Sequence, residues 1–312
     1  MLGELRCLSH LNIAGLRVLD SSVAHAVRQM PCLRHLNVSR TMFVGNSTLE
    51  ALAAHSPSRL VKLQAAFTSC TNNGLIAALP ALKALKHVDF DSCAVGEGLV
   101  ALENCQRLEV ARLADTMAGN DVAEALSRVH CLECLDISFT PMVNEIGMRY
   151  ISRIRGLRSL AMSTAERMPE YLELGLPRLT SLDLSGCRIS DAHCSALSKM
   201  DSLRYLDLTG GEMTCRGVEC LSGLRRNLRC LSVSHARYIS DECVPFVARL
   251  DRLVKLNVSG CALSDRALLD LSLALPDLKV LGLADMSVGR QLIVELVHIN
   301  ASLNINGLKT KL

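Results

Sequence analysis

A unit of about 25 residues recurs along this whole chain, and its period restricts the fold more than any other feature. Nearly every unit begins with a leucine and has apolar residues at its positions 1, 4 and 6. The units begin at Leu8, Leu33, Leu60, Leu85, Leu108, Leu132, Leu157, Leu179, Leu203, Leu228, Leu253 and Leu278, with a partial unit at Leu303. The shortest interval is 22 residues (Leu157 to Leu179), and the longest is 27 (Leu33 to Leu60). Spacing this even predicts a solenoid of stacked repeats.

The first half of each unit alternates between apolar and polar residues, as a half-buried strand does. In the unit that begins at Leu179, the pattern places Leu182 and Leu184 in the core and turns Ser181 and Asp183 toward solvent. A small residue at position 9 then lets the chain turn inward. Each unit therefore begins with a short strand and a tight turn.

The second half of each unit has the spacing of a helix. Leu268, Leu271 and Leu275 recur at helical intervals, and Ser264 or Asp265 can cap the free amides at the start. Parallel strands about 4.8 Å apart, with wider helices behind them, predict an α/β horseshoe with the sheet on its concave face and the helices on its convex face. Because each unit buries its apolar face only against its neighbours, we expect residues 1–312 to form a single domain of about 12 repeats.

The amino-acid sequences around two of the turns resemble those of a known repeat family. These segments are LDLSGCRISD at 182–191 and LNVSGCALSD at 256–265. They resemble the cysteine-containing subclass of leucine-rich repeats, whose relatives include ribonuclease-inhibitor-like horseshoes, substrate receptors of F-box ubiquitin ligases and trypanosomatid proteins described as adenylate-cyclase regulators. The resemblance covers essentially the whole chain and implies the horseshoe fold. About half of the units have threonine or alanine at position 9 instead of the family's asparagine or cysteine, which argues against a continuous side-chain ladder along the turns.

Composition and the first residues exclude several classes of protein. No uncharged apolar run approaches the roughly 18 residues of a membrane helix, so we expect no membrane insertion. The start, 1–12, contains Glu4 and Arg6 and has no apolar segment of the secretory kind, which favours a cytoplasmic or nuclear location. A net charge of +3 is too small to predict nucleic acid as a partner.

The 14 cysteines are expected to be free thiols, since no secretory signal is found. Many of them serve as small apolar side chains in turns and helices. Cys131 and Cys134 form a CxxC motif, which also occurs in redox and zinc sites. They fall at the entry to a strand, where extended chain places them about 10 Å apart and on opposite sides. We therefore favour a structural role for this pair.

No catalytic motif is found in the sequence. GxSxG, Walker, GxGxxG and HExxH patterns are all missing. His10, His35 and His87 share position 3 of their units, but Lys62 lies between the last two and would repel a metal cation. We interpret these histidines as solvated surface residues. The sequence thus predicts no enzyme activity, no cofactor and no metal site.

The register identifies the residues on the outward face of the strands, at positions 3, 5 and 7. Position 3 is basic near the N-terminus, and position 5 is acidic in the middle of the chain. There Asp183 and Asp207 fall on neighbouring strands, about 5 Å apart. Arg204 or Arg229 at position 2, or a basic group of a partner, is expected to offset these two like charges.

Three aromatic residues lie on or beside this face, and aromatic side chains are favoured as interface anchors. Tyr205 is expected to be exposed at position 3. Phe67 and Phe139, at position 8, either are exposed in the same way or pack inward under the return loop. The predicted partner-binding residues are His35, Lys62, Phe67, His87, Asp89, Arg112, Asp136, Phe139, Asp183, Arg204, Tyr205, Asp207, Arg229, Lys255 and Asn257.

The two ends of the solenoid differ. Asn304 and Lys309 make the last unit polar, as an end cap requires. Nothing polar shields Leu5, Leu8 and Leu11 at the other end, so we expect another domain or subunit to cover this edge.

These features favour a non-enzymatic module that binds a protein partner on the concave face. One alternative is a substrate-recognition subunit of a ubiquitin ligase complex, although the repeats begin too early to leave room for an F-box. Another is a regulator or inhibitor of a second enzyme, as the cyclase-regulator resemblance implies. No residue pattern decides between them.

Overall fold

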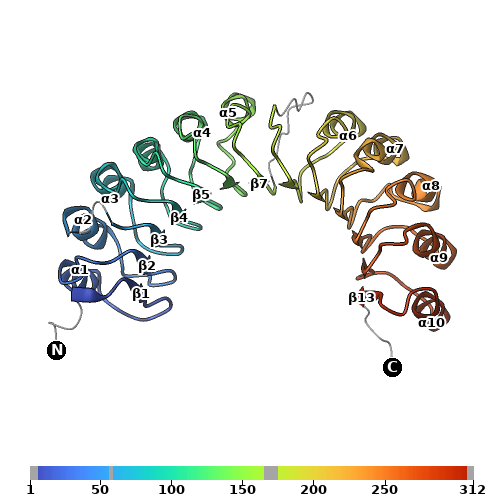
Figure 1. Ribbon diagram of the computed structural model, residues 1–312, viewed down its shortest axis with the longest axis horizontal. Coiled ribbons are helices and arrows are strands. Elements are labelled where there is room, and N and C mark those ends of the chain that lie inside the picture. Colours follow the sequence, from blue (N-terminus) through green and yellow to red (C-terminus); the bar gives the residue numbers. More distant parts are fainter. Residues whose placement is uncertain (1–5, 56–58, 165–174, 308–312) are drawn as a thin grey trace. The chain divides into compact units, whose positions relative to one another are not determined.

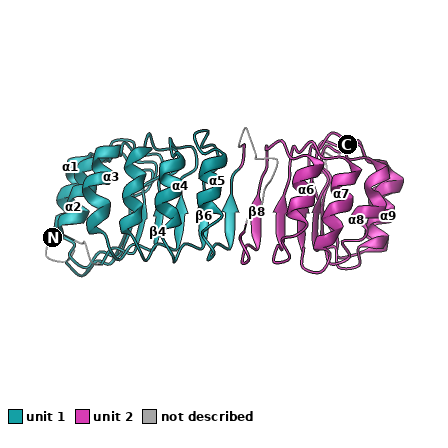
Figure 2. Ribbon diagram, turned by 90° about the horizontal axis from the view of Figure 1, so that it is seen from above, with its two compact units in different colours: residues 1–162 teal, residues 163–312 magenta. Residues whose placement is uncertain are grey.

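The computed structural model describes residues 6–55, 59–164 and 175–307. The described chain falls into two compact units, residues 1–162 (unit 1) and 163–312 (unit 2), which Figure 2 shows in different colours. Leu5 and Lys309, which the sequence places at the two ends of the solenoid, lie outside the described residues. The single domain over 1–312 stays a prediction.

Unit 1 is a parallel sheet with helices on one face (Figure 1). Its strands are β1 (His10–Asn12), β2 (His35–Asn37), β3 (Lys62–Gln64), β4 (His87–Asp89), β5 (Val110–Arg112), β6 (Cys134–Asp136) and β7 (Ser159–Ala161). Each strand pairs with the next in the same register, so that position 3 faces position 3 and position 5 faces position 5. The helical elements are α1 (Asp20–Arg28), α2 (Asn46–His55), α3 (Asn72–Ala78), η2 (Leu79–Ala81), η3 (Glu97–Asn104), α4 (Asn120–Ser127) and α5 (Glu145–Ile151).

Unit 2 repeats this architecture. Its strands are β8 (Ser181–Asp183), β9 (Tyr205–Asp207), β10 (Cys230–Ser232), β11 (Lys255–Asn257), β12 (Val280–Gly282) and β13 (Asn304–Asn306). They are also parallel and in register. Its helical elements are α6 (Asp191–Leu197), α7 (Cys215–Leu221), η4 (Ser222–Leu224), η5 (Asp241–Cys243), α8 (Val244–Val247), α9 (Asp265–Ala274) and α10 (Arg290–Ile299). The predicted fold class, parallel strands on one face and helices on the other, is confirmed within each unit.

The core contains the residues that the alternation places there. The leading leucines from Leu33 onward are buried, as are Leu182 and Leu184. In the first repeat Leu8 and Leu11 are only half-buried, because no preceding repeat covers them in the described chain. Cover of this edge by another domain or subunit stays a prediction.

One predicted helix has a different geometry. The fourth repeat contains the 3-10 helix η3 where its neighbours have α-helices. This repeat has only 23 residues, from Leu85 to Leu108.

Asparagine and aspartate side chains link successive helices within each unit. Asn72 accepts hydrogen bonds from the backbone N–H groups of Gly96 and Gly98, at 2.8 and 3.1 Å. Asn120 does the same for Asn144 and Gly147 one repeat later. These bonds satisfy the free amides at the start of the next helix from a neighbouring repeat. Sequence reasoning recognised only caps within a helix, such as Ser264, which does accept from the N–H of Ala267 at 3.2 Å.

Position 9 has two kinds of hydrogen bond, which explains why threonine replaces cysteine there. Thr116 and Thr140 donate to the position 6 carbonyl of their own repeat, at 2.7 and 2.6 Å. Cys93 and Cys261 donate to the position 6 carbonyl of the preceding repeat, at 3.0 and 3.1 Å. The threonine bonds close within one repeat, so the side chains form no continuous ladder through these turns.

The expectation that all cysteines are free thiols is wrong in one place. Cys215 and Cys243 form a disulfide, with their Cα atoms 4.8 Å apart. Cys215 opens α7 and Cys243 ends η5 in the next repeat, so the stacking of the helical layer brings them together. Their 28-residue separation gives no sign of this contact in the sequence. The other cysteines, including Cys131 and Cys134, are free thiols.

None of the helices in the described ranges has the length and apolarity needed to cross a bilayer.

Candidate functional site

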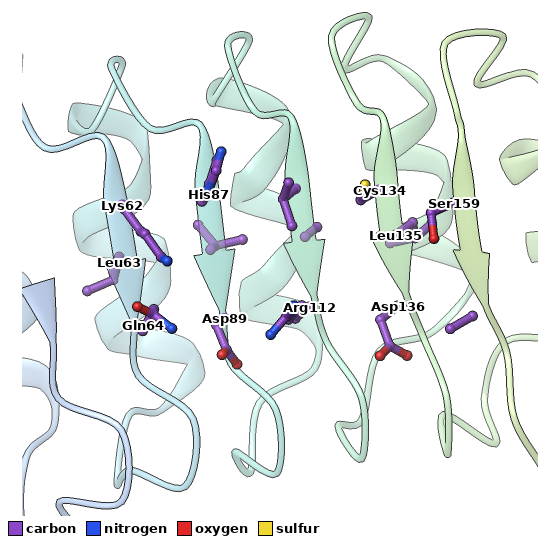
Figure 3. Close-up of a pocket in the computed structure, with 14 residues that line it drawn as sticks. Lys62, Leu63, Gln64, His87, Asp89, Arg112, Cys134, Leu135, Asp136 and Ser159 are labelled. Atoms are coloured by element: carbon purple, nitrogen blue, oxygen red, sulfur yellow. The ribbon is translucent and has the colours of Figure 1, made fainter. Parts of the chain in front are cut away.

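A depression of about 410 Å³ lies on the open face of the unit 1 sheet, across β3 to β7 (Figure 3). We call it the β3–β7 groove. Its outward side chains come from positions 3 and 5 of five consecutive strands, because alternate residues of a strand point to the same face. These outward residues are Lys62, Gln64, His87, Asp89, Val110, Arg112, Cys134, Asp136, Ser159 and Ala161. The position 4 residues Leu63, Val88, Ala111 and Leu135 also line it.

Charges of opposite sign lie side by side in the groove. Arg112 is in register with Asp89 on one neighbouring strand and with Asp136 on the other. Figure 3 shows these three side chains in one row at the position 5 level. Within the described ranges, no ion pair joins Arg112 to either carboxylate. The row therefore offers an exposed guanidinium with a carboxylate on each side.

The carboxylates of this row are held in place by their own turns. One oxygen of Asp136 accepts the backbone N–H of Ser138 at 3.0 Å, and one oxygen of Asp89 accepts that of Asp91 at 3.2 Å. Asn37 makes the same bond to Ser39 in the second repeat. An aspartate or asparagine at position 5 thus has a local structural role, as in an Asx turn. The negative charge is not needed for that role.

Asp91 is a third carboxylate, at position 7 of the repeat that begins at Leu85. The pKa of Asp91 is raised to about 6, chiefly by burial; the nearby charges of Asp89 and Asp136 contribute to the rise, and the Ala114 N–H and Arg112 oppose it. The Ala114 N–H donates to its carboxylate at 2.8 Å. In the sequence, Asp91 differs from the other position 7 residues, which are Ser, Thr or Ala, and this difference could have identified it as a candidate site residue.

The basic residues at position 3 begin two strands before the groove, at His10 on β1. Burial lowers the pKa of His35, and the neighbouring His10, Lys62 and His87 lower it further. The rings of His10 and His35 meet edge to face, with centroids 4.1 Å apart. His87 also lies 3.7 Å from Glu109, a position 2 residue that the outward-face assignment omitted. Across the described ranges, no group of three or more His, Cys, Asp or Glu side chains could hold a metal ion.

Unit 2 has its own depression, of about 360 Å³, lined among others by Tyr205, Asp207, Lys255 and Asn257. Asp183 and Asp207 are in register on β8 and β9, as the sequence predicts. Tyr205 donates its hydroxyl to Asp207 at 3.3 Å. Burial raises the pKa of Tyr205 to about 12, with the negative charges of Asp207 and Asp183 next in effect.

The expected compensation of Asp183 and Asp207 by arginine is not found. Arg229 donates instead to the carbonyls of Arg226 and Leu228, at 3.4 and 3.1 Å. Among the described residues, no ion pair links Arg204 or Arg229 to these aspartates. Ser232 and Gly282, at the same position 5, are buried.

None of the predicted partner-binding residues is buried. Phe67, Arg112, Phe139, Arg204, Tyr205 and Lys255 are exposed, and His35, Lys62, His87, Asp89, Asp136, Asp183, Arg229, Asp207 and Asn257 are half-buried. Phe67 and Phe139 project outward and do not pack under the return loop, which decides between the two alternatives for them. They lie in the turns and do not line the β3–β7 groove. That these residues bind a partner stays a prediction.

Comparisons with known proteins bear on the fold. A family model described as Leucine Rich repeat matches residues 176–198. No curated protein matches the chain. An internalin from Listeria monocytogenes is similar in structure, with 16% identity, a TM-score of 0.63, and coverage of 92% of this chain and 89% of that one. An LRR protein from Leptospira interrogans has 14% identity and a TM-score of 0.46, with 98% and 97% of the two chains covered.

At these identities, the likeness to the internalin concerns the fold and nothing further. Assignment to the cysteine-containing subclass rests only on the amino-acid sequence of the turns. The repeated strand, turn and helix, the matched segment and the internalin likeness together identify this chain as a protein of the leucine-rich repeat fold.

Proposed function

We propose that this chain is a non-enzymatic module that binds a partner protein through the β3–β7 groove. Leucine-rich repeat proteins generally mediate protein–protein interaction. The observation that carries the proposal is the row of Asp89, Arg112 and Asp136, whose charges alternate and are not closed into ion pairs with one another. A partner segment with the opposite alternation can pair with all three.

The rigid backbone and fixed carboxylates of the groove favour binding of a partner whose charges match their positions. Strands β3 to β6 are hydrogen-bonded on both sides, and the two aspartates are fixed by bonds to their own turns. Little side-chain freedom is therefore lost on binding, which reduces the entropic cost of association. Alternating charges also exclude partners of the wrong pattern, because like charges brought together cost several kcal/mol.

The remaining parts of the proposal are less specific. The location is proposed to be cytoplasmic or nuclear, and fluorescence microscopy of the tagged chain tests this. Recognition of substrates for a ubiquitin ligase and regulation of another enzyme are narrower roles that no observation on the described residues favours. Co-purification with a cullin adaptor would support the first, and an activity assay with candidate cyclases addresses the second.

The test removes charge without disturbing the fold. Asn37 and Asn257 show that asparagine makes the same position 5 bond as aspartate, so a D89N/D136N chain is expected to fold normally. Proteins captured from cell extract by the wild type and by this variant would be compared by quantitative mass spectrometry. The specific partner should be depleted at least about tenfold in the variant, in line with the loss of two interfacial charges.

A matched control is E50Q, which removes one negative charge from the exposed face of α2. It should leave capture of the partner at the wild-type level. Equal capture by the wild type and by D89N/D136N would show that the β3–β7 groove is not the binding surface.

A further inference from the structure

A second depression, of about 340 Å³, lies in unit 1 at the turns that follow β1, β2 and β3. Leu16, Met42, Phe43 and Phe67 supply its apolar lining, and Arg17 and Arg40 supply its charge. The three turns stack directly on one another: the Gly15 N–H donates to Ser39 O at 2.9 Å, and the Arg40 N–H donates to Ala66 O at 2.8 Å. The depression is therefore built from rigidly paired backbone, and it is separate from the β3–β7 groove. We call it the turn pocket.

The lining of the turn pocket is unusually apolar for an open surface. Met42 is 68% exposed, Phe43 57%, Leu16 53% and Phe67 48%. Four large apolar side chains gathered around one hollow form a patch of the kind that marks an interaction site, whereas single exposed apolar residues need no explanation. Methionine adds a flexible, polarizable surface that adapts to the shape of a bound side chain.

Phe67 is also in an unfavourable backbone conformation. Its φ is 55°, in the left-handed region that this turn position takes in each described repeat, with glycine at Gly15, Gly186, Gly210 and Gly260 and other residues elsewhere. A bulky residue in this region costs roughly 1–2 kcal/mol compared with glycine. The ring recovers no burial in exchange, because it faces solvent.

The charge of the turn pocket identifies the kind of group that fits. The guanidinium carbon of Arg40 lies 5.4 Å from the centroid of the Phe67 ring. Among the described residues, no carboxylate forms an ion pair with Arg40 or Arg17. The two guanidinium groups can therefore donate hydrogen bonds to carboxylates of a ligand whose apolar side chain occupies the hollow between them.

We propose that the turn pocket docks a short segment of a partner protein in which a large apolar side chain lies beside carboxylates. This inference rests on the proposed function, since it assumes a protein partner, but it assigns a second surface. The hollow shape favours a peptide over a lipid surface, because insertion into a bilayer requires apolar side chains that protrude and not a cavity that receives one.

The experiment selects binders without assuming their sequence. A phage-displayed library of random peptides is panned against the immobilised whole chain, and the enriched peptides are synthesised and measured by fluorescence anisotropy. We expect peptides with a Leu, Phe or Trp beside Asp or Glu. Their affinity should fall about tenfold or more in F67N and in R17E/R40E, since these changes remove the aromatic wall and the cationic rim.

Two controls test specificity. I76S removes an equally exposed apolar residue from α3, and K83E reverses a charge on a return loop; both should leave the peptide affinity unchanged. Sedimentation with vesicles of phosphatidylcholine and phosphatidylserine tests the lipid alternative. Vesicle binding that is lost in F67N would overturn the proposal, as would a failure to enrich peptides or the enrichment of basic ones.

The result separates the two surfaces. If R112E abolishes peptide binding and F67N does not, the peptide occupies the β3–β7 groove. The inference about the turn pocket is then wrong while the proposed function stands.

Discussion

The side-chain oxygen of Asn120 accepts a hydrogen bond from the backbone N–H of Gly147, one repeat away, at 2.9 Å. The approach is so close that a Cβ on residue 147 would lie 2.6 Å from that oxygen. The bond satisfies a free amide at the start of α5 and fixes the distance between α4 and α5.

Loss of this bond should destabilise the chain. N120A removes the acceptor of the Asn144 and Gly147 amides, and G147A forces the helices apart, so each should lower the free energy of unfolding by about 1–3 kcal/mol. Urea unfolding followed by circular dichroism measures this. E50A, an exposed change on α2, serves as the control and should be neutral. If the urea midpoint of G147A equals that of the wild type, the contact between Asn120 and Gly147 does not contribute to stability.

Replacement of Phe67 should not cost stability. F67N puts a residue that tolerates the left-handed region into a turn where φ is 55°. Relief of strain and loss of the Arg40 contact oppose each other, and we expect a net change between zero and a gain of about 1 kcal/mol. By contrast, F90A removes a fully buried ring and should cost about 3–5 kcal/mol. A large loss in F67N would mean that the Phe67 ring supports the fold.

The raised pKa of Asp91 predicts a specific dependence of stability on pH. Because its pKa is about 6 in the folded chain and lower when unfolded, the folded state binds the proton more tightly. The resulting stabilisation is complete below about pH 4 and is lost as the pH rises through 6. At pH 8, D91N should therefore be more stable than the wild type, by about 1 kcal/mol after allowance for the half-exposed carboxyl.

The measurement for D91N is the thermal midpoint between pH 4 and pH 8. The difference from the wild type should shrink toward zero at the acidic end, where both side chains are neutral. A constant difference across this range would show that the titration of Asp91 is not its cause.

The Cys215–Cys243 disulfide should stabilise unit 2. It closes a loop of 28 residues, for which the loss of chain entropy in the unfolded state predicts a contribution of about 3.5 kcal/mol. Dithiothreitol should lower the thermal midpoint of the wild type and leave that of C215S/C243S unchanged. Thiol titration of the denatured, unreduced wild type should find twelve free thiols, since two of its 14 cysteines are paired. Fourteen reactive thiols would contradict the pairing.

The sequence by itself determined the register, and with it the strands and their faces. Strand alternation is a local property: if Leu182 and Leu184 are inside, Asp183 must be outside. The same argument placed Asp89, Arg112 and Asp136 on one face before any contact was known. It also aligned them across strands, because the repeats keep their leading leucines in register.

Contacts between repeats were decided only by the tertiary structure. The bond of Asn120 to Gly147, the pairing of Cys215 with Cys243 and the raised pKa of Asp91 each depend on how close the backbone of one repeat lies to the next. The outward orientation of Phe67 depends on the left-handed turn that holds it. Period and polarity specify which side of an element a residue occupies, but distances between stacked elements arise from packing, and burial, disulfides and pKa values follow from those distances.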